Sequence, residues 1–366
     1  MHSLARQFVV EYHLIFRKMR IAARAARTAF AAAAFVGVKN IDDKLLPTNI
    51  EIIRPKNDLS DVPISRKIVN PADHSGLNLR LYQYQSCPFC SKVRAFLDFH
   101  GFSYEVVEVN PVTKSQLKFS KDYKKVPLIT STEGTHVESS LIISELSTYL
   151  RRPDVSLTQI GEMYPMIEMA DSSGKVTKCC PNKYFIMKGE AGSEAELGAE
   201  REERMWREWV DNHFVHLISP NIYRTLGESM ETFEWFSKYG EWEIHFSTFS
   251  RLLAKYVGAF MMFLIAKRLK TRHNITDEKK AMVDAFDEWM DAIGPNRKFM
   301  GGDSPNLADL AMYGAMMSFY GCTAFAQMVA DRPIQRWYND MRTAVKNHEG
   351  RALIAARTKA LTAKTA

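Results

Sequence analysis

The stretch that decides the fold is Gln83-Tyr84-Gln85-Ser86-Cys87-Pro88-Phe89-Cys90-Ser91, in which two residues separate two cysteines. Before it, residues 78–84 alternate in side-chain character, which predicts a short strand. After it, Val93, Phe96 and Leu97 recur at helical spacing. We therefore expect a helix that begins at Cys87, with Pro88 at its first position, where no intrahelical N–H is lost.

This arrangement favours thiol chemistry. Unpaired amides at a helix N-terminus stabilise an anion, so the pKa of Cys87 should lie below that of a free thiol. Lys92 and Arg94 add positive charge nearby, and Cys90 has the position of a resolving thiol. A strand, Cys-x-x-Cys and a helix are typical of a thioredoxin-like redox motif, with an inert pair as the alternative. No metal site is predicted, because Cys179-Cys180 do not form a second Cys-x-x-Cys.

Length and charge limit the classes of function that this chain can have. The 366 residues predict about two domains, and five cysteines with one Cys-x-x-Cys indicate a reducing compartment. The net charge of +7 is concentrated in residues 1–41, which carry seven Lys or Arg and one acid, so only +1 remains for the rest. A basic leader of this kind indicates targeting or a membrane surface and argues against nucleic acid as a partner.

The leader has two further features. Its arginines at 17, 20, 24 and 27 would form one charged stripe on a helix, which suits an anionic membrane surface. Residues 28–38 are uncharged, but they are too few for the ~20 that a membrane span needs. A mitochondrial presequence and an untethered tail are the alternatives.

The rest of the chain predicts an α+β protein. Residues 42–76 contain four prolines and are expected to form a linker with one added edge strand near residues 50–54. The order βαβαββα follows, with strands at 78–84, 104–109, from 126 and at 136–139, and helices after 87, at 113–119 and at 140–150. A connection at 151–200, with a hairpin around Lys183–Met187, leads to helices at 201–366. The apolar run Val257–Ala266 is expected to be a buried helix that lines the cleft or a dimer contact.

Two pairs of residues could hold a peptide-like ligand. A proline before a strand in a thioredoxin-like fold is cis and faces the active cysteine, so Pro127 would turn the backbone N–H and C=O of Val126 toward an extended peptide. Glu138 and Ser139 stand beside the N-terminus of the next helix, where an acid, a hydroxyl and free amides would clasp an amino-acid head group.

These motifs carry a family resemblance. Residues 79–150 resemble the glutathione-binding half of a glutathione transferase of glutaredoxin type. Residues 87–111, with the blocks 216–225, 266–273 and 300–310, resemble the family of membrane-associated prostaglandin E synthases of type 2. The resemblance implies a thioredoxin/glutaredoxin-like domain at 77–150 and an all-α glutathione-transferase C-terminal-like domain at 201–366.

It also implies a site and a reaction. Glutathione would be held by Val126, Pro127, Glu138 and Ser139, with Glu138 in place of the family's aspartate. Prostaglandin H2 would be isomerised to prostaglandin E2 with the Cys87 thiolate as nucleophile or base. Cys90 would be accessory, and Tyr84 would hydrogen-bond an endoperoxide oxygen.

Further expectations rest on the same resemblance. They are a homodimer, haem bound through the thiol of glutathione, and a Golgi-type endomembrane facing the cytoplasm with a processed soluble form, or alternatively the mitochondrion. Two rival functions stay open. One is a glutaredoxin-like thiol-disulfide oxidoreductase that needs both Cys87 and Cys90. The other is a non-enzymatic glutathione- or haem-binding protein at a membrane.

Overall fold

The computed structural model describes residues 51–53, 62–170, 176–189 and 192–365, so the predicted leader and most of the predicted linker lie outside the described residues. Contacts divide the chain into two compact units, residues 1–41 with 164–181 and residues 42–163 with 182–366. The described part of the first unit contains the antiparallel hairpin β7 (Ile167–Ala170) and β8 (Val176–Cys179).

The hairpin predicted at Lys183–Met187 is therefore wrong. This segment uses its polar groups on other partners: the guanidinium of Arg207 donates to the carbonyl of Tyr184 at 2.9 Å, and the Tyr184 side chain is buried. Residues 181–184 form a turn, and residues 185–188 belong to no strand.

The second unit contains a six-stranded sheet in the order β1-β2-β4-β3-β5-β6. Its strands are β1 (Glu51–Ile53), β2 (Arg66–Val69), β3 (Leu79–Gln83), β4 (Tyr104–Glu108), β5 (Leu128–Ser131) and β6 (Gly134–Val137). β3 and β4 are parallel, and every other neighbouring pair is antiparallel. With α2 (Pro88–His100) and α3 (Ser139–Arg151), the predicted thioredoxin-like βαβαββα order is confirmed, although its second helix is only the 3₁₀ turn η2 (Ser115–Leu117).

The described residues between 51 and 76 contribute two strands instead of the single one that was expected. β2 pairs with the outer edge of β4, with Ile68 opposite Tyr104, and β1 then pairs with β2. An open sheet edge presents unpaired N–H and C=O groups, and β2 satisfies those of β4.

The helical region that follows confirms the second half of the fold prediction. Its elements are α4 (Leu157–Glu162), α5 (Glu194–Trp209), the π-helical turn η3 (Val210–Phe214), α6 (Val215–Ile222), α7 (Leu226–Tyr239), α8 (Trp242–His245), α9 (Thr248–Leu252), the π-helical turn η4 (Leu253–Val257), α10 (Gly258–Arg272), α11 (Glu278–Ile293), α12 (Leu307–Met317), α13 (Thr323–Val329), α14 (Pro333–Lys346) and α15 (Arg351–Thr365). Asn306 caps α12, and the carboxylate of Asp309 accepts from the Asn306 backbone at 3.0 Å.

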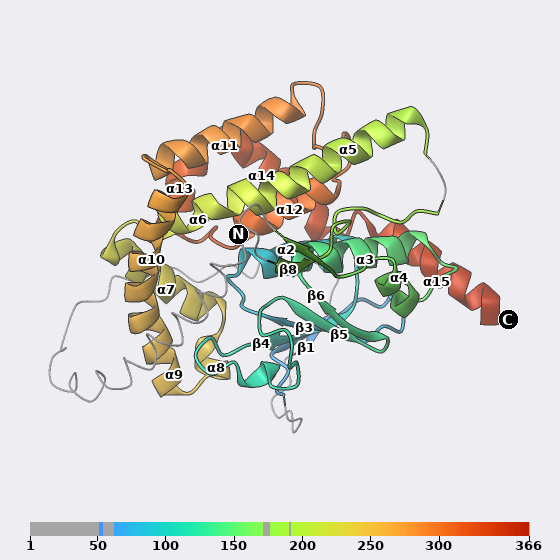
Figure 1. Ribbon diagram of the computed structural model, residues 1–366, viewed down its shortest axis with the longest axis horizontal. Helices are drawn as coiled ribbons and strands as arrows, with labels where there is room; N and C mark the ends of the chain where they lie inside the picture. The colour runs from blue at the N-terminus through green and yellow to red at the C-terminus, as the bar shows by residue number, and fades with distance from the viewer. Residues whose placement is uncertain (1–50, 54–61, 171–175, 190–191, 366) are drawn as a thin grey trace. The chain divides into compact units, whose positions relative to one another are not determined.

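The helical region packs directly on the helix that carries Cys-x-x-Cys, and Figure 1 shows α12 beside α2. At Gly314 of α12, a Cβ atom would lie 2.5 Å from the Cα atom of Lys92. Only glycine permits this approach, so the backbones of α12 and α2 meet without an intervening side chain.

The expectation that Val257–Ala266 is a buried helix is wrong. Within α10 the buried side chains are those of Ala259 and Ala266. The helix packs on the rest of the molecule through small residues, so its larger apolar side chains stay partly or largely exposed.

Candidate functional site

The local structure around Cys87 follows the sequence prediction. Cys87 is the N-cap residue of α2, with φ −81° and ψ 125°, and Pro88 occupies the first turn. The Cys87 N–H donates to the carbonyl of Tyr84 at 3.0 Å, which closes the turn between β3 and α2. Cys87 is partly exposed, whereas Cys90 one turn further on is fully buried. A reagent therefore reaches Cys87 first.

The surroundings shift the pKa values of the two thiols in opposite directions. A hydrogen bond from the Cys90 thiol lowers the pKa of Cys87 against the effect of burial, helped by the amides of Cys90 and Phe89 and by the charge of Arg94. Burial and the neighbouring Cys87 raise the pKa of Cys90 well above its ordinary value. A thiolate at Cys87 next to a protonated thiol at Cys90 is the arrangement of an attacking and an accessory sulfur.

A buried polar network holds the strand end that precedes Cys87. The guanidinium of Arg94 donates to the carbonyl of Gln85 and to the hydroxyl of Ser91, each at 2.8 Å. The Gln85 N–H donates to the Glu108 carboxylate at 3.1 Å, and Arg66 donates to the same carboxylate at 2.9 Å. Arg66 comes from β2, so a strand that the sequence did not predict contributes to the support of the site.

Lys92 does not act on Cys87 in the way that the sequence suggested. Its ammonium is fully buried and pairs with Asp211 in η3. Asp211 also accepts from the hydroxyls of Ser140, in the first turn of α3, and of Tyr184 at 3.0 Å. The charge of Lys92 is therefore compensated by the helical region, and Arg94 is the cation that lowers the pKa of Cys87.

The predicted peptide-binding edge lies directly before β5. The Val126–Pro127 peptide bond is cis, as the sequence predicted. The pairing of β3 with β5 ends with Tyr82 opposite Leu128, the residue after Pro127, so Val126 and Tyr84 both follow the paired ends of their strands. Both side chains pack on one apolar cluster that includes Tyr82 and Leu128. Among the described residues, none hydrogen-bonds to the backbone of Val126.

Glu138 and Ser139 stand where α3 begins. Glu138 is the N-cap residue and has φ 72°, a conformation that residues other than glycine rarely adopt and that is found mainly where a site requires it. The Ser139 hydroxyl and one Glu138 carboxylate oxygen are buried and have no hydrogen-bond partner within the part of the chain that the structure describes. Lys183 Nζ lies 3.8 Å from that oxygen. Orphaned buried polar atoms at a helix N-terminus are suited to a polar ligand.

Sequence reasoning missed two tyrosines near the cysteines. Burial raises the pKa of Tyr123, and the charges of Glu138, Cys90 and Cys87 add to this shift. Burial likewise raises the pKa of Tyr223, which ends α6, with contributions from Cys322 and Cys87. Tyr223 lies inside the block at 216–225, whose resemblance to a family was noted without a role for this residue.

Comparisons with known proteins show what this chain is similar to. A family model described as "Glutathione S-transferase, N-terminal domain" matches residues 81–149. Prostaglandin E synthase 2 of Mus musculus is 44% identical over 280 residues, which cover 74% of this chain and 71% of that protein. The Danio rerio protein of the same name is 41% identical over 276 residues, 74% of this chain and 72% of its own length. Glutathione transferase F7 from Populus trichocarpa has a TM-score of 0.43 and 16% identity, covering 75% of this chain and 99% of that structure.

This chain is a glutathione-transferase-like protein with a cysteine at the start of α2. The class is defined by the thioredoxin-like sheet, the cis-proline before β5 and the helices that pack on α2. The matched family model covers the sheet half of this arrangement. By its identity and coverage with the two vertebrate relatives, the chain belongs to the prostaglandin E synthase 2 family.

Proposed function

We propose that this chain isomerises prostaglandin H2 to prostaglandin E2 with Cys87 as the working thiol. The name of the two relatives supports the product. The observation that carries the proposal is the partly exposed Cys87 at the start of α2, where Cys90, two amides and Arg94 lower its pKa. A thiol with a lowered pKa is ionised to a higher fraction than an ordinary thiol at a given pH, which favours the thiolate as the base.

The reaction balances without an oxidant or a reductant. The Cys87 thiolate takes the proton from the ring carbon that bears one endoperoxide oxygen, and the C–H electron pair becomes the second bond of the new ketone. The O–O bond breaks, and its electrons pass to the other oxygen. This oxygen takes the proton back from the Cys87 thiol to become the alcohol, which restores the thiolate. In this proposal Tyr84 donates a hydrogen bond to that second oxygen, where negative charge develops.

Glutathione fits the neighbouring groups. The backbone of Val126 would pair with the peptide part of the ligand, while Glu138 and Ser139 would hold its ammonium and carboxylate. The unsatisfied Ser139 hydroxyl supports this assignment. Bound glutathione would supply a second thiol beside Cys87. Haem, which the family resemblance also implies, gains no support from the side chains described at this site, and the proposal takes no step through it.

Attachment and assembly form a separate part of the proposal. The basic residues 1–41 would place the protein on a Golgi-type membrane facing the cytoplasm, and two copies would form a homodimer. Fusing residues 1–41 to a fluorescent protein tests the first point, since co-localisation with mitochondria would replace it by the presequence alternative. Sedimentation velocity of the full chain tests the second.

Product analysis tests the isomerase directly. We expect full-length protein with prostaglandin H2 and glutathione to form prostaglandin E2 above the uncatalysed background. Cys87→Ser should lose this activity, while Cys90→Ser should retain most of it. Cys322→Ser is the matched control, because Cys322 is a buried thiol at the start of α13 and should leave activity unchanged. Activity that survives Cys87→Ser would contradict the role of this thiol.

A glutaredoxin-like oxidoreductase is the second candidate. The hydrogen bond between Cys87 and Cys90, with opposite pKa shifts, favours it, because such a pair can exchange with a disulfide. Reduction of a mixed disulfide by glutathione that is lost in both Cys87→Ser and Cys90→Ser, without prostaglandin E2 formation, would support this function. Binding of glutathione without either turnover would support a non-enzymatic role.

A further inference from the structure

One helical segment of this protein is apolar, and yet few of its side chains are buried. α9, η4 and α10 run without a break from Thr248 to Arg272, and this segment is long and apolar enough to cross a membrane. Its buried side chains are Ala254, Ala259 and Ala266. Core helices bury their large apolar residues, so this segment is not an ordinary core helix.

The inner side of the segment is fixed on α7. The Ser229 hydroxyl donates to the carbonyl of Ala259 at 2.6 Å, and Glu234 pairs with Lys255. A Cβ atom at Gly258 would lie 2.6 Å from the ring of Phe233, so the two helices meet closely there. A helix held in this way on a globular domain presents only its outer side to another phase, and it does not cross a bilayer.

The outer side carries large apolar side chains three or four residues apart. This stripe consists of Phe249, Leu252, Tyr256, Phe260 and Leu264, all of them exposed. Phe249 is 72% exposed, and Ile244 of the adjoining α8 is 71% exposed. From Phe249 to Leu264 the stripe extends over roughly 20 Å of helix. Contiguous exposed apolar surface of this kind marks an interaction site.

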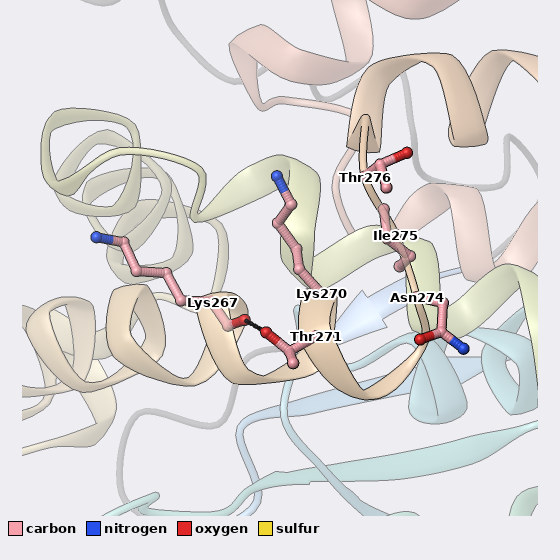
Figure 2. Close-up of a pocket in the computed structure, with 6 residues that line it drawn as sticks. All are labelled: Lys267, Lys270, Thr271, Asn274, Ile275 and Thr276. Atoms are coloured by element: carbon pink, nitrogen blue, oxygen red, sulfur yellow. Dashed lines mark hydrogen bonds between the residues drawn. The ribbon is translucent and has the colours of Figure 1, made fainter.

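The charge of the segment identifies what the site fits. Residues 248–272 contain six Lys or Arg and no Asp or Glu. Four of the six lie in the last six residues. Figure 2 shows the side chains of Lys267 and Lys270 at this end of α10. Both line a hollow of about 470 Å³. Among the described residues, none forms an ion pair with Lys267 or Arg272. Arg251, Lys255 and Lys270 already pair with Glu243, Glu234 and Glu278. Lys267 and Arg272 are left for an external anion, which the phosphates of anionic lipid would supply.

We propose that the outer face of residues 248–272 lies on an anionic phospholipid bilayer. The stripe enters the boundary between head groups and acyl chains, where aromatic side chains are favoured, and Lys267 and Arg272 at the end of α10 contact lipid phosphates. This surface belongs to the folded helical region. It is a membrane contact distinct from the one proposed for residues 1–41, and it does not depend on the reaction at Cys87.

Vesicle co-sedimentation of the full chain tests this surface. Arg17, Arg20, Arg24 and Arg27 are first changed to glutamine, so that the leader contributes no charge. In this background, Phe249→Ser with Phe260→Ser is expected to weaken binding to phosphatidylcholine–phosphatidylserine vesicles by about tenfold or more. Leu197→Ser with Met205→Ser is the matched control, because both side chains are exposed on α5 and their loss should leave binding unchanged.

A charge variant separates the electrostatic part of the membrane contact from its apolar part. Lys267→Glu with Arg272→Glu should weaken binding to the anionic vesicles by about tenfold and leave binding to pure phosphatidylcholine vesicles unchanged. All variants should keep the wild-type circular dichroism spectrum. If Phe249→Ser with Phe260→Ser binds vesicles like its parent, the proposal is overturned. If the same variant instead converts a dimer to a monomer in sedimentation velocity, the face is a subunit interface and the proposal also fails.

Discussion

The buried ion pair of Lys92 and Asp211 allows the loss of stability on mutation to be predicted, because the hydrogen bonds of both side chains are described. The Lys92 side chain is 0% exposed, and Asp211 accepts from Lys92, Ser140 and Tyr184. Replacing one member of a buried ion pair leaves the other charge uncompensated, at about 3–5 kcal/mol. We therefore expect Asp211→Asn, which keeps the shape and an acceptor oxygen for the hydroxyls, to lower the free energy of unfolding by about 3–4 kcal/mol.

A double-mutant cycle isolates the pair. Lys92→Met combined with Asp211→Asn removes both charges, so its loss of stability should be about 1–2 kcal/mol, well below the sum of the two single variants. Asp284→Asn is the surface control. Asp284 pairs with Lys280 in α11, but both side chains are more than half exposed, and its loss should cost less than about 0.5 kcal/mol.

Equilibrium unfolding in urea, followed by tryptophan fluorescence and circular dichroism, measures these differences. The loss in free energy of unfolding caused by Asp211→Asn also depends on pH. Burial opposes ionisation, but the charge and hydrogen bond of Lys92 and the Ser140 hydroxyl lower the pKa of Asp211 below its ordinary 3.8. The stabilisation is thus complete above about pH 4 and is lost as the pH falls through the folded-state pKa. A deficit no larger than that of Asp284→Asn, or additive losses in the double variant, would refute the reasoning.

Three further predictions concern other parts of the unit. Cys90→Ala should raise the pKa of Cys87, because the hydrogen bond from Cys90 is the main cause of its lowering. The pH dependence of Cys87 alkylation, followed by peptide mass spectrometry, should therefore shift to higher pH. An unchanged pH dependence would contradict this cause. Gly314→Ala should destabilise the protein by about 1–3 kcal/mol, because the new methyl group meets the Lys92 backbone. Gly198→Ala in α5, where nothing lies within 4 Å, should instead stabilise by about 0.5–1 kcal/mol, and equal effects of the two in urea unfolding would disprove the close contact. Burial lowers the pKa of His100 to about 4 from 6.5, so the native state holds this ring neutral. Stability should therefore fall by about 3 kcal/mol between pH 6.5 and pH 4, and His100→Asn should remove that part of the pH dependence.

The site was predictable where the chemistry is local. Cys87 at a helix start and cis-Pro127 before a strand are features of a few consecutive residues, and the structure confirms both placements. The role of Lys92 was not predictable, because its partner Asp211 is 119 residues away in sequence. β2 was missed because its four residues gain their stability from pairing with β4 rather than from their own pattern. The exposure of α10 was missed because an apolar run does not report which of its faces finds a partner.

The contact at Gly314 affects how substrate and product can enter and leave the site at Cys87. Because the backbones of α12 and α2 touch at this position, there is no side chain that could rotate away to let the two helices separate. A hinge opening between the helical region and α2 would have to break this backbone contact, so we expect ligand exchange to use the loops at residues 84–87 and 121–127 instead. Directed evolution toward bulkier substrates would then succeed through changes in these loops and fail through changes that loosen the helix contact.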